Sequence, residues 1–177
     1  MDITNTMQSD IKSIIASQRE YFASNVTLER SFRLEQLKKL QKALIRWEKS
    51  ILDALWSDLH KSPQEAILTE LSIVNGEIKN HISHLREWMR CKSASTPLKM
   101  MPSRSCVVSE PLGTALIVSP WNYPVQLLLN PLVGAISAGC TAVLKPSPYV
   151  PNVSRVIEEM ICSTFDKRYI AVSRGWL

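Results

Sequence analysis

Two short apolar runs constrain the fold of this chain more than any other feature. Residues Thr114–Val118 and Thr141–Leu144 are each followed by a proline-containing turn, and a segment of helical character separates them. Apolar runs of this length without polar alternation are typical of parallel strands that are covered on both faces. Consecutive parallel strands are usually joined by a helix. The sequence therefore predicts an α/β fold with a strand–turn–helix–strand–turn unit.

Polar side chains stand in both of these turns. Asn122 lies between two prolines in the turn Ser119–Pro124, and Lys145 opens the turn after the second run. Ligands of open α/β sheets bind at the carboxyl ends of the strands, so we expect both side chains to reach one crevice. There an amide can donate a hydrogen bond and a lysine offers a cation with three donors. Two other interpretations stay open, because a turn asparagine can bond its own backbone and a strand-end lysine can be solvated.

The two turns resemble those of a known family. Pro120–Pro124 reads PWNYP and Leu144–Ser147 reads LKPS, and both are similar to turns of the aldehyde dehydrogenase superfamily. Segments that look like its class 3 branch are Arg33–Leu40, Ala54–Lys61, Glu65–Glu70 and Glu110–Gly113. The resemblance runs from about residue 10 to about residue 172 and covers only the front part of the family's fold. It implies N-terminal helices followed by the first strands of a Rossmann-like parallel sheet.

The resemblance also implies roles for individual residues. Asn122 would donate a hydrogen bond to the oxygen of the reacting aldehyde, an interaction worth about 3–4 kcal/mol in the transition state. Lys145 would contact the adenosine ribose of NAD or NADP. Further contacts with the cofactor are implied for Val118, Ser119, Pro120, Trp121 and Ser147.

One residue departs from the family pattern at this crevice. Pro148 stands where the family commonly has a glutamate after Lys-Pro-Ser. That glutamate accepts hydrogen bonds from the ribose hydroxyls, and its charge repels a 2′-phosphate. The departure predicts that NADP is accepted at least as well as NAD.

The family's reaction needs groups that this sequence does not match. A cysteine thiolate attacks the aldehyde, hydride passes to the nicotinamide, and a glutamate-activated water hydrolyses the thioester. Residues 1–177 match neither the motif of that cysteine, nor that of the base, nor the glycine-rich turn over the pyrophosphate. Residues 172–177 begin like the family's strand-to-glycine turn and then depart from it, which suggests a truncation or a frame change. We therefore expect an inactive N-terminal portion, with a non-catalytic helical interaction module as the alternative.

The chain divides into three predicted segments. Residues 1–92 are expected to form helices that pack on the cofactor domain, residues 93–112 a linker with an oligomerisation hairpin, and residues 113–177 the first part of the NAD(P)-binding domain. The family resemblance implies that this hairpin contacts a partner subunit, so a homodimer is expected. Thr27 is a candidate N-cap, and Gly76 suggests close helix packing. Helices are predicted over 7–24, 27–60, 64–90, 125–138 and 152–165, and strands over 103–110 and 169–172.

Composition excludes several other classes of function. The net charge of +5 comes from basic residues interleaved with acids, which is typical of a solvated surface rather than of a nucleic-acid interface. No run approaches 18 apolar residues, so no membrane span is predicted. The first five residues lack the basic-then-apolar pattern of a secretory signal, and we expect a cytoplasmic protein.

The cysteines and histidines do not form a metal-binding pattern. No Cys-x-x-Cys spacing occurs, and His81 and His84 have no third ligand nearby, so no metal site is predicted. Cys140 precedes an apolar strand, where a buried structural thiol is favoured over a nucleophile. In a cytoplasmic protein the cysteines are expected to be reduced thiols. The four cysteines are Cys91, Cys106, Cys140 and Cys162.

Overall fold

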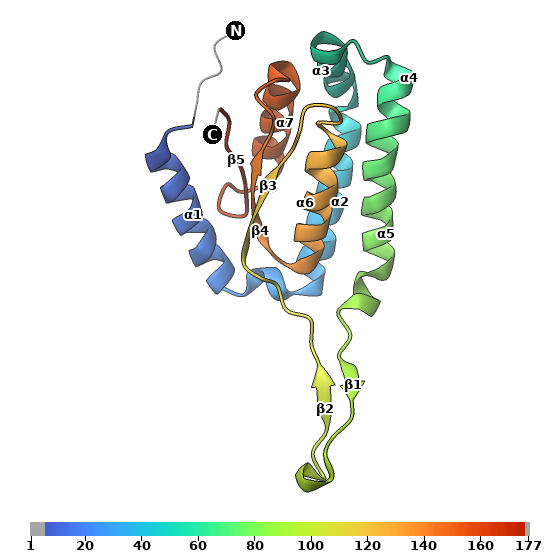
Figure 1. Ribbon diagram of the computed structural model, residues 1–177, viewed down its shortest axis with the longest axis vertical. Helices are drawn as coiled ribbons and strands as arrows, with labels where there is room; N and C mark the ends of the chain where they lie inside the picture. The colour runs from blue at the N-terminus through green and yellow to red at the C-terminus, as the bar shows by residue number, and fades with distance from the viewer. Residues whose placement is uncertain (1–5, 176–177) are drawn as a thin grey trace.

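A three-stranded parallel sheet lies between helices on both of its faces in the computed structural model, which describes residues 6–175 (Figure 1). The strand order is β3-β4-β5, so neighbouring strands are also consecutive in the chain, and one helix joins each pair. Helix α1 packs on β3 and β4, whereas α6 and α7 pack against the strands from the opposite face. The predicted α/β class is confirmed.

The secondary-structure elements are α1 (Gln8–Ala23), η1 (Val26–Leu28), α2 (Arg30–Arg46), α3 (Glu48–Leu59), α4 (Pro63–Ala66), η2 (Ile67–Leu71), α5 (Ser72–Trp88), β1 (Lys92–Ala94), η3 (Leu98–Met100), β2 (Ser105–Val107), β3 (Thr114–Val118), α6 (Gln126–Ala138), β4 (Thr141–Lys145), α7 (Pro151–Thr164) and β5 (Ile170–Val172).

The middle strand, β4, pairs in parallel with both β3 and β5. Every residue of β4 is buried, as expected for a strand with neighbours on both sides and helices on both faces. Thr114 pairs with Thr141 and Val118 pairs with Lys145, so β3 and β4 start and end together. Strand β3 is more open, and the side chain of Leu116 is 66% exposed. Among residues 6–175, no further strand pairs with the outer edge of β3.

Helices α2, α3 and α5 form a second layer behind α6 and α7. Helix α2 packs on α5, α6 and α7, and α3 packs on α7. The helix predicted over 27–60 is interrupted at Trp47, which has φ −96° and ψ 2°, so it is two elements, α2 and α3. The apolar residues Leu37, Leu40, Leu44, Ile51 and Leu55 form one buried stripe across this break. His60 then ends α3 in the left-handed region at φ 52°, and the Ser62 hydroxyl caps α4 by accepting from the Glu65 amide.

Two local predictions were wrong. Thr27 does not cap a helix, because it is buried within η1 and α2 begins only after Glu29. Gly76 does not mark close packing, since a methyl group added there would meet no atom within 4 Å. The helix predicted over 64–90 is present over 63–88, where α4 and α5 are joined by η2, a π-helical turn that adds a residue to the repeat.

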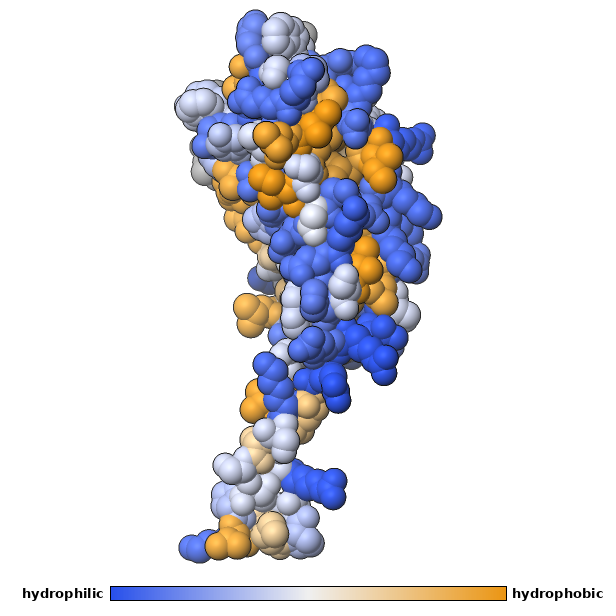
Figure 2. Space-filling view, turned by 90° about the vertical axis from the view of Figure 1, so that its right-hand side faces the viewer, coloured by the Kyte–Doolittle hydropathy of each residue, from blue (hydrophilic) through white to orange (hydrophobic). Residues whose placement is uncertain are grey.

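A two-stranded arm projects from the body between α5 and β3. Strands β1 and β2 pair antiparallel, with Ser93 opposite Cys106, and Figure 2 shows the arm as a narrow extension below the body. Its tip carries exposed apolar side chains, among them Leu98 at 88% and Met101 at 63% exposure. The predicted hairpin is therefore present.

The two ends of the chain are only partly within the described residues. The predictions for residues 1–5 and for residues 176–177 lie outside them. No helix within residues 6–175 has the length and apolar character needed to cross a membrane.

Gly139 is expected to tolerate no side chain. It ends α6 at φ +87°, and an added Cβ would lie 2.6 Å from the Arg33 guanidinium. That guanidinium is fixed by the carbonyls of Thr27 at 2.9 Å and Ser137 at 3.1 Å. We expect Gly139→Ala to lower the free energy of unfolding by about 1–3 kcal/mol, measured by urea titration. Gly134→Ala is the matched control, because that helical position has open space and should gain about 0.5–1 kcal/mol. Equal effects of the two substitutions would contradict this account.

Candidate active site at the carboxyl ends of the strands

The turns after the three parallel strands lie side by side. The Ser119 amide donates to the Lys145 carbonyl at 3.2 Å, which continues the β3–β4 ladder into the turns. The Ser173 amide donates to the Leu144 carbonyl at 2.8 Å, which does the same for β4 and β5. The structure thus brings the predicted Asn122 turn and the predicted Lys145 turn to one edge of the sheet.

The turn after β3 presents its side chains to solvent. Asn122 is exposed, and its side-chain amide has no hydrogen-bond partner among residues 6–175. Val118 and Trp121 are 53% and 54% exposed, and Pro120 is exposed as well. Ser119 differs, because its hydroxyl is buried without a partner in the described part of the chain. The amide of Asn122 is therefore available to a ligand, and the buried Ser119 hydroxyl has no bond to another described residue.

The turn after β4 holds a buried cation. Lys145 is only 9% exposed, and its Nζ donates to the Gly175 carbonyl at 2.7 Å. The interpretation of Lys145 as a solvated lysine is therefore wrong. Ser147 is buried too, and its hydroxyl accepts weakly from the Tyr149 amide at 3.3 Å. Pro148 follows at a half-buried position of the same turn.

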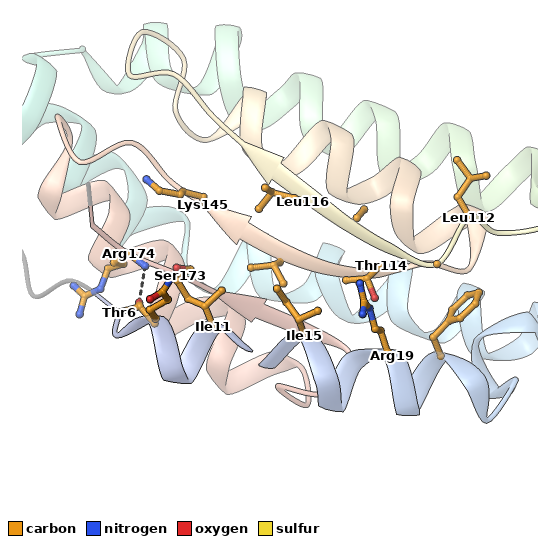
Figure 3. Close-up of a pocket in the computed structure, with 15 residues that line it drawn as sticks. Thr6, Ile11, Ile15, Arg19, Leu112, Thr114, Leu116, Lys145, Ser173 and Arg174 are labelled. Atoms are coloured by element: carbon orange, nitrogen blue, oxygen red, sulfur yellow. Dashed lines mark hydrogen bonds between the residues drawn. The ribbon is translucent and has the colours of Figure 1, made fainter. Parts of the chain in front are cut away.

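A groove of about 860 Å³ runs from this edge along the sheet beneath α1 (Figure 3). Ile11 and Ile15 of α1 face Leu116 of β3 across it. Lys145 lies towards one end of the groove and Arg19 towards the other. Its volume is that of a small-molecule site, and its lining is mainly apolar with a few charges. At that end Lys145 offers a cation that fits an anionic cofactor, whereas Ser119 and Asn122 lie on the adjacent turn and do not line the groove.

A buried ion pair lies directly under the Asn122 turn. The Lys61 Nζ donates to Glu70 Oε1 at 2.6 Å and to the Asn122 carbonyl at 3.0 Å. The other carboxylate oxygen of Glu70 accepts from the amides of Val125 at 2.8 Å and Gln126 at 3.2 Å. Lys61 is 7% exposed and Glu70 is fully buried. Lys61, before α4, thus holds the middle of this turn, and Glu70, from η2, holds the end that enters α6.

The sequence contains a signal for Glu70 that we did not use. Glu70 follows the buried residue Ala66 by four positions and precedes the buried residue Val74 by four, so it lies on the apolar stripe of its helix. A carboxylate on such a stripe is rarely buried unless it is paired. No comparable pattern marks Lys61, which follows α3 in a short loop and finds its partner only in the folded chain.

No metal-binding cluster occurs within residues 6–175, counting groups of three or more His, Cys, Asp or Glu. His81 instead contacts Glu77 at 3.0 Å and lies edge-on to Trp88. Cys140 is a buried thiol, as the sequence favoured, and Cys91, Cys106 and Cys162 are exposed free thiols.

Comparison with known proteins decides the family. The sequence model of the aldehyde dehydrogenase family matches residues 1–171. The chain belongs to the aldehyde dehydrogenase family. It is 47% identical over 157 residues to a 4,4'-diaponeurosporen-aldehyde dehydrogenase of Staphylococcus aureus, which covers 89% of this chain and 34% of that one. It is 41% identical over 157 residues to the bovine aldehyde dehydrogenase family 3 member B1, again covering 89% and 34%. These relatives confirm the class 3 resemblance.

Solved structures of aldehyde dehydrogenases share the fold. The substrate-bound Staphylococcus aureus AldH matches with a TM-score of 0.91 and 45% identity over 94% of this chain and 36% of that one. An NADP complex of glyceraldehyde-3-phosphate dehydrogenase GapN from Methanocaldococcus jannaschii matches with a TM-score of 0.81, 99% of this chain and 38% of that one. At 19% identity, this second likeness concerns the fold alone. The chain spans about a third of the length of the aldehyde dehydrogenases that it matches.

Proposed function

We propose that this chain is the N-terminal portion of an NAD(P)-dependent aldehyde dehydrogenase that oxidises aldehydes to carboxylic acids. The observation that carries the proposal is the Asn122 turn. Its side-chain amide is unpaired within the described residues, and the turn is anchored beside the end of β4. Family membership supports aldehyde oxidation, and the geometry of the turn supports the role of the asparagine.

The proposed role of Asn122 is to stabilise the oxyanion. When a nucleophile attacks the aldehyde carbon, negative charge develops on the carbonyl oxygen. A preorganised donor at that oxygen lowers the barrier, because its dipole need not reorient during the reaction. The anchored Pro120–Pro124 turn supplies such a donor, and the nucleophile and general base would come from residues that follow the matched region.

The proposed cofactor is NAD or NADP, which accepts the hydride from the substrate. Lys145 would hold the ribose, with its Nζ at the edge where it now bonds the Gly175 carbonyl. The orphaned Ser119 hydroxyl supports a polar contact, and the exposed Val118, Pro120 and Trp121 would border the cofactor. Ser147 would bind from the same turn as Lys145.

We further propose that the enzyme is a homodimer in which the arm of β1 and β2 contacts the partner. The exposed apolar tip of the arm supports this proposal, because such side chains gain stability when they are covered. The cytoplasmic location and the division at residues 92 and 112 stay predictions.

A chimeric enzyme, called the joined enzyme below, tests the proposed function. Residues 1–171 of this chain would be followed by the part of the Staphylococcus aureus diaponeurosporen-aldehyde dehydrogenase beyond the matched region. We expect it to reduce NAD or NADP with a medium-chain aldehyde, whereas the 177-residue chain alone shows no turnover. Turnover by the chain alone that Cys140→Ser abolishes would contradict the proposal and make Cys140 a nucleophile. A folded joined enzyme that binds no cofactor would favour the non-catalytic module.

Cofactor preference gives a further expected result. Pro148 has no side-chain acceptor for the ribose hydroxyls and no charge that repels a 2′-phosphate. A glutamate at this position would accept hydrogen bonds from the ribose and repel the phosphate. A hydrogen bond to a charged group is worth about 1.5–3 kcal/mol, which corresponds to tenfold or more in specificity. We expect Pro148→Glu in the joined enzyme to raise the ratio of kcat/KM for NAD over NADP by about tenfold or more. An unchanged kcat/KM for NADP after this substitution would contradict the assignment.

A further inference from the structure

The geometry points to Lys61 and Glu70 as positioning residues that aim the amide of Asn122. This inference rests on the proposed function, because it concerns how the oxyanion donor is held. Neither residue reaches the crevice with its own charge, since both side chains are buried beneath the turn. They would act on the reaction only through the backbone that carries Asn122.

Glu70 fixes the end of the turn that enters α6. One oxygen of its carboxylate accepts from the Val125 and Gln126 amides, which are among the unpaired donors at the start of that helix. Val125 and Glu70 are both fully buried, so this contact is shielded from water. Glu70 belongs to the π-helical turn η2, and turns of this kind often occur at functional sites.

Lys61 fixes the turn at Asn122 itself. Its Nζ donates to the Asn122 carbonyl at 3.0 Å and lies 4.3 Å from the centre of the Tyr123 ring. The bond to Glu70 at 2.6 Å ties this contact to the one at α6. A single ion pair therefore links the carbonyl of Asn122 with the amides three and four residues later. Rotation of the peptide that contains the Asn122 carbonyl requires the Lys61 hydrogen bond to break.

A purely structural ion pair is the competing interpretation, and the two make different predictions. A pair that only joins η2 to α6 would stabilise the whole chain without favouring one reaction step. A positioning pair sets the direction of one donor, so its removal should slow the step in which that donor acts and leave substrate binding nearly unchanged.

Hydrogen exchange of the intact 177-residue chain tests whether the pair acts locally. Lys61→Arg keeps the charge, Lys61→Met removes it, and Lys49→Met breaks the exposed Lys49–Asp53 pair as a control. Lys61→Met lowers global stability as well, and peptides from β4 and β5 report that general increase in exchange. We expect exchange in a peptide spanning 119–127 to rise clearly beyond this general increase, with Lys61→Arg between Lys61→Met and the unmodified chain. A rise in 119–127 that is no larger than that in β4 and β5 would overturn the inference.

A double-mutant cycle in the joined enzyme tests whether the pair acts through Asn122. Glu70→Gln keeps an acceptor and the side-chain shape, and we expect it to lower kcat by about 10- to 100-fold with little change in KM. In an Asn122→Ala background the same substitution should lower kcat no further. Equal fold-losses in both backgrounds would overturn the inference while leaving the proposed function intact. If Asn122→Ala alone leaves kcat unchanged, the proposed function fails and the inference falls with it.

Discussion

Replacing Asn122 with alanine in the joined enzyme is expected to lower kcat by about 100- to 1,000-fold, which is the usual effect of removing one oxyanion donor. The amide acts only as negative charge develops on the aldehyde oxygen, so KM should change little. Steady-state rates of NAD(P) reduction at saturating cofactor measure both constants. Because the Asn122 side chain is exposed, its truncation should not disturb folding, and a loss of kcat can be assigned to the reaction.

Asn80→Ala is the matched control for this substitution, because Asn80 is an exposed asparagine of α5 far along the chain from the crevice. It should leave kcat unchanged. Cofactor affinity, measured by fluorescence titration without aldehyde, should also be the same in the Asn122 variant and the parent. A fall of kcat below threefold would show that the turn does not supply the oxyanion donor.

Replacing Lys61 with methionine is expected to destabilise the chain by about 3–5 kcal/mol, the usual effect of breaking a buried ion pair from one side. The substitution leaves the Glu70 carboxylate fully buried without its cation. Since a domain of ordinary stability has only about 5–15 kcal/mol to lose, the midpoint of urea unfolding should fall sharply. Lys49→Met breaks the ion pair between Lys49 Nζ and Asp53 Oδ2, whose distance of 2.7 Å is nearly that of the Lys61–Glu70 pair. The side chains of Lys49 and Asp53 are 88% and 65% exposed. That control should change stability by less than about 1 kcal/mol.

Removing both charges should recover much of the loss. In the double variant Lys61→Met with Glu70→Gln, no charge is left buried, and the glutamine oxygen can still accept from the Val125 amide. We expect the double variant to be more stable than Lys61→Met alone. A loss in Lys61→Met as small as that in Lys49→Met would mean that water reaches Glu70.

The main features of the fold were predictable because each rests on a local pattern. The apolar runs that become β3 and β4 have the length and composition of covered strands, and the structure pairs them in parallel. Asn122 and Lys145 were expected at one edge because parallel strands end together. The roles of these two residues, unlike their positions, stay predictions.

Other features depend on contacts between distant segments, which no local pattern reveals. The break at Trp47 was missed because the buried stripe continues across it. Asp58 belongs to a segment that we used only for family resemblance. In the structure its carboxylate accepts from the Asn152 side chain at 2.7 Å and from the Val153 amide at 2.9 Å, and so caps α7. The pairing of Lys61 with Glu70, and of both with the Asn122 turn, likewise exists only once the helical layer meets the sheet.

The position of α1 has a consequence for the order of folding during synthesis. The buried side-chain amide of Gln18 donates to the Ala142 carbonyl at 2.8 Å, and the Thr6 amide donates to the Arg174 carbonyl at 3.0 Å. Helix α1 therefore cannot dock until β4, and then the segment after β5, have left the ribosome. At about 5–20 residues per second, the 168 residues between Thr6 and Arg174 correspond to a wait of roughly 10–30 s. During that interval the apolar side of α1 is uncovered, so a nascent-chain chaperone can bind α1 for longer than it can bind the helices that follow it.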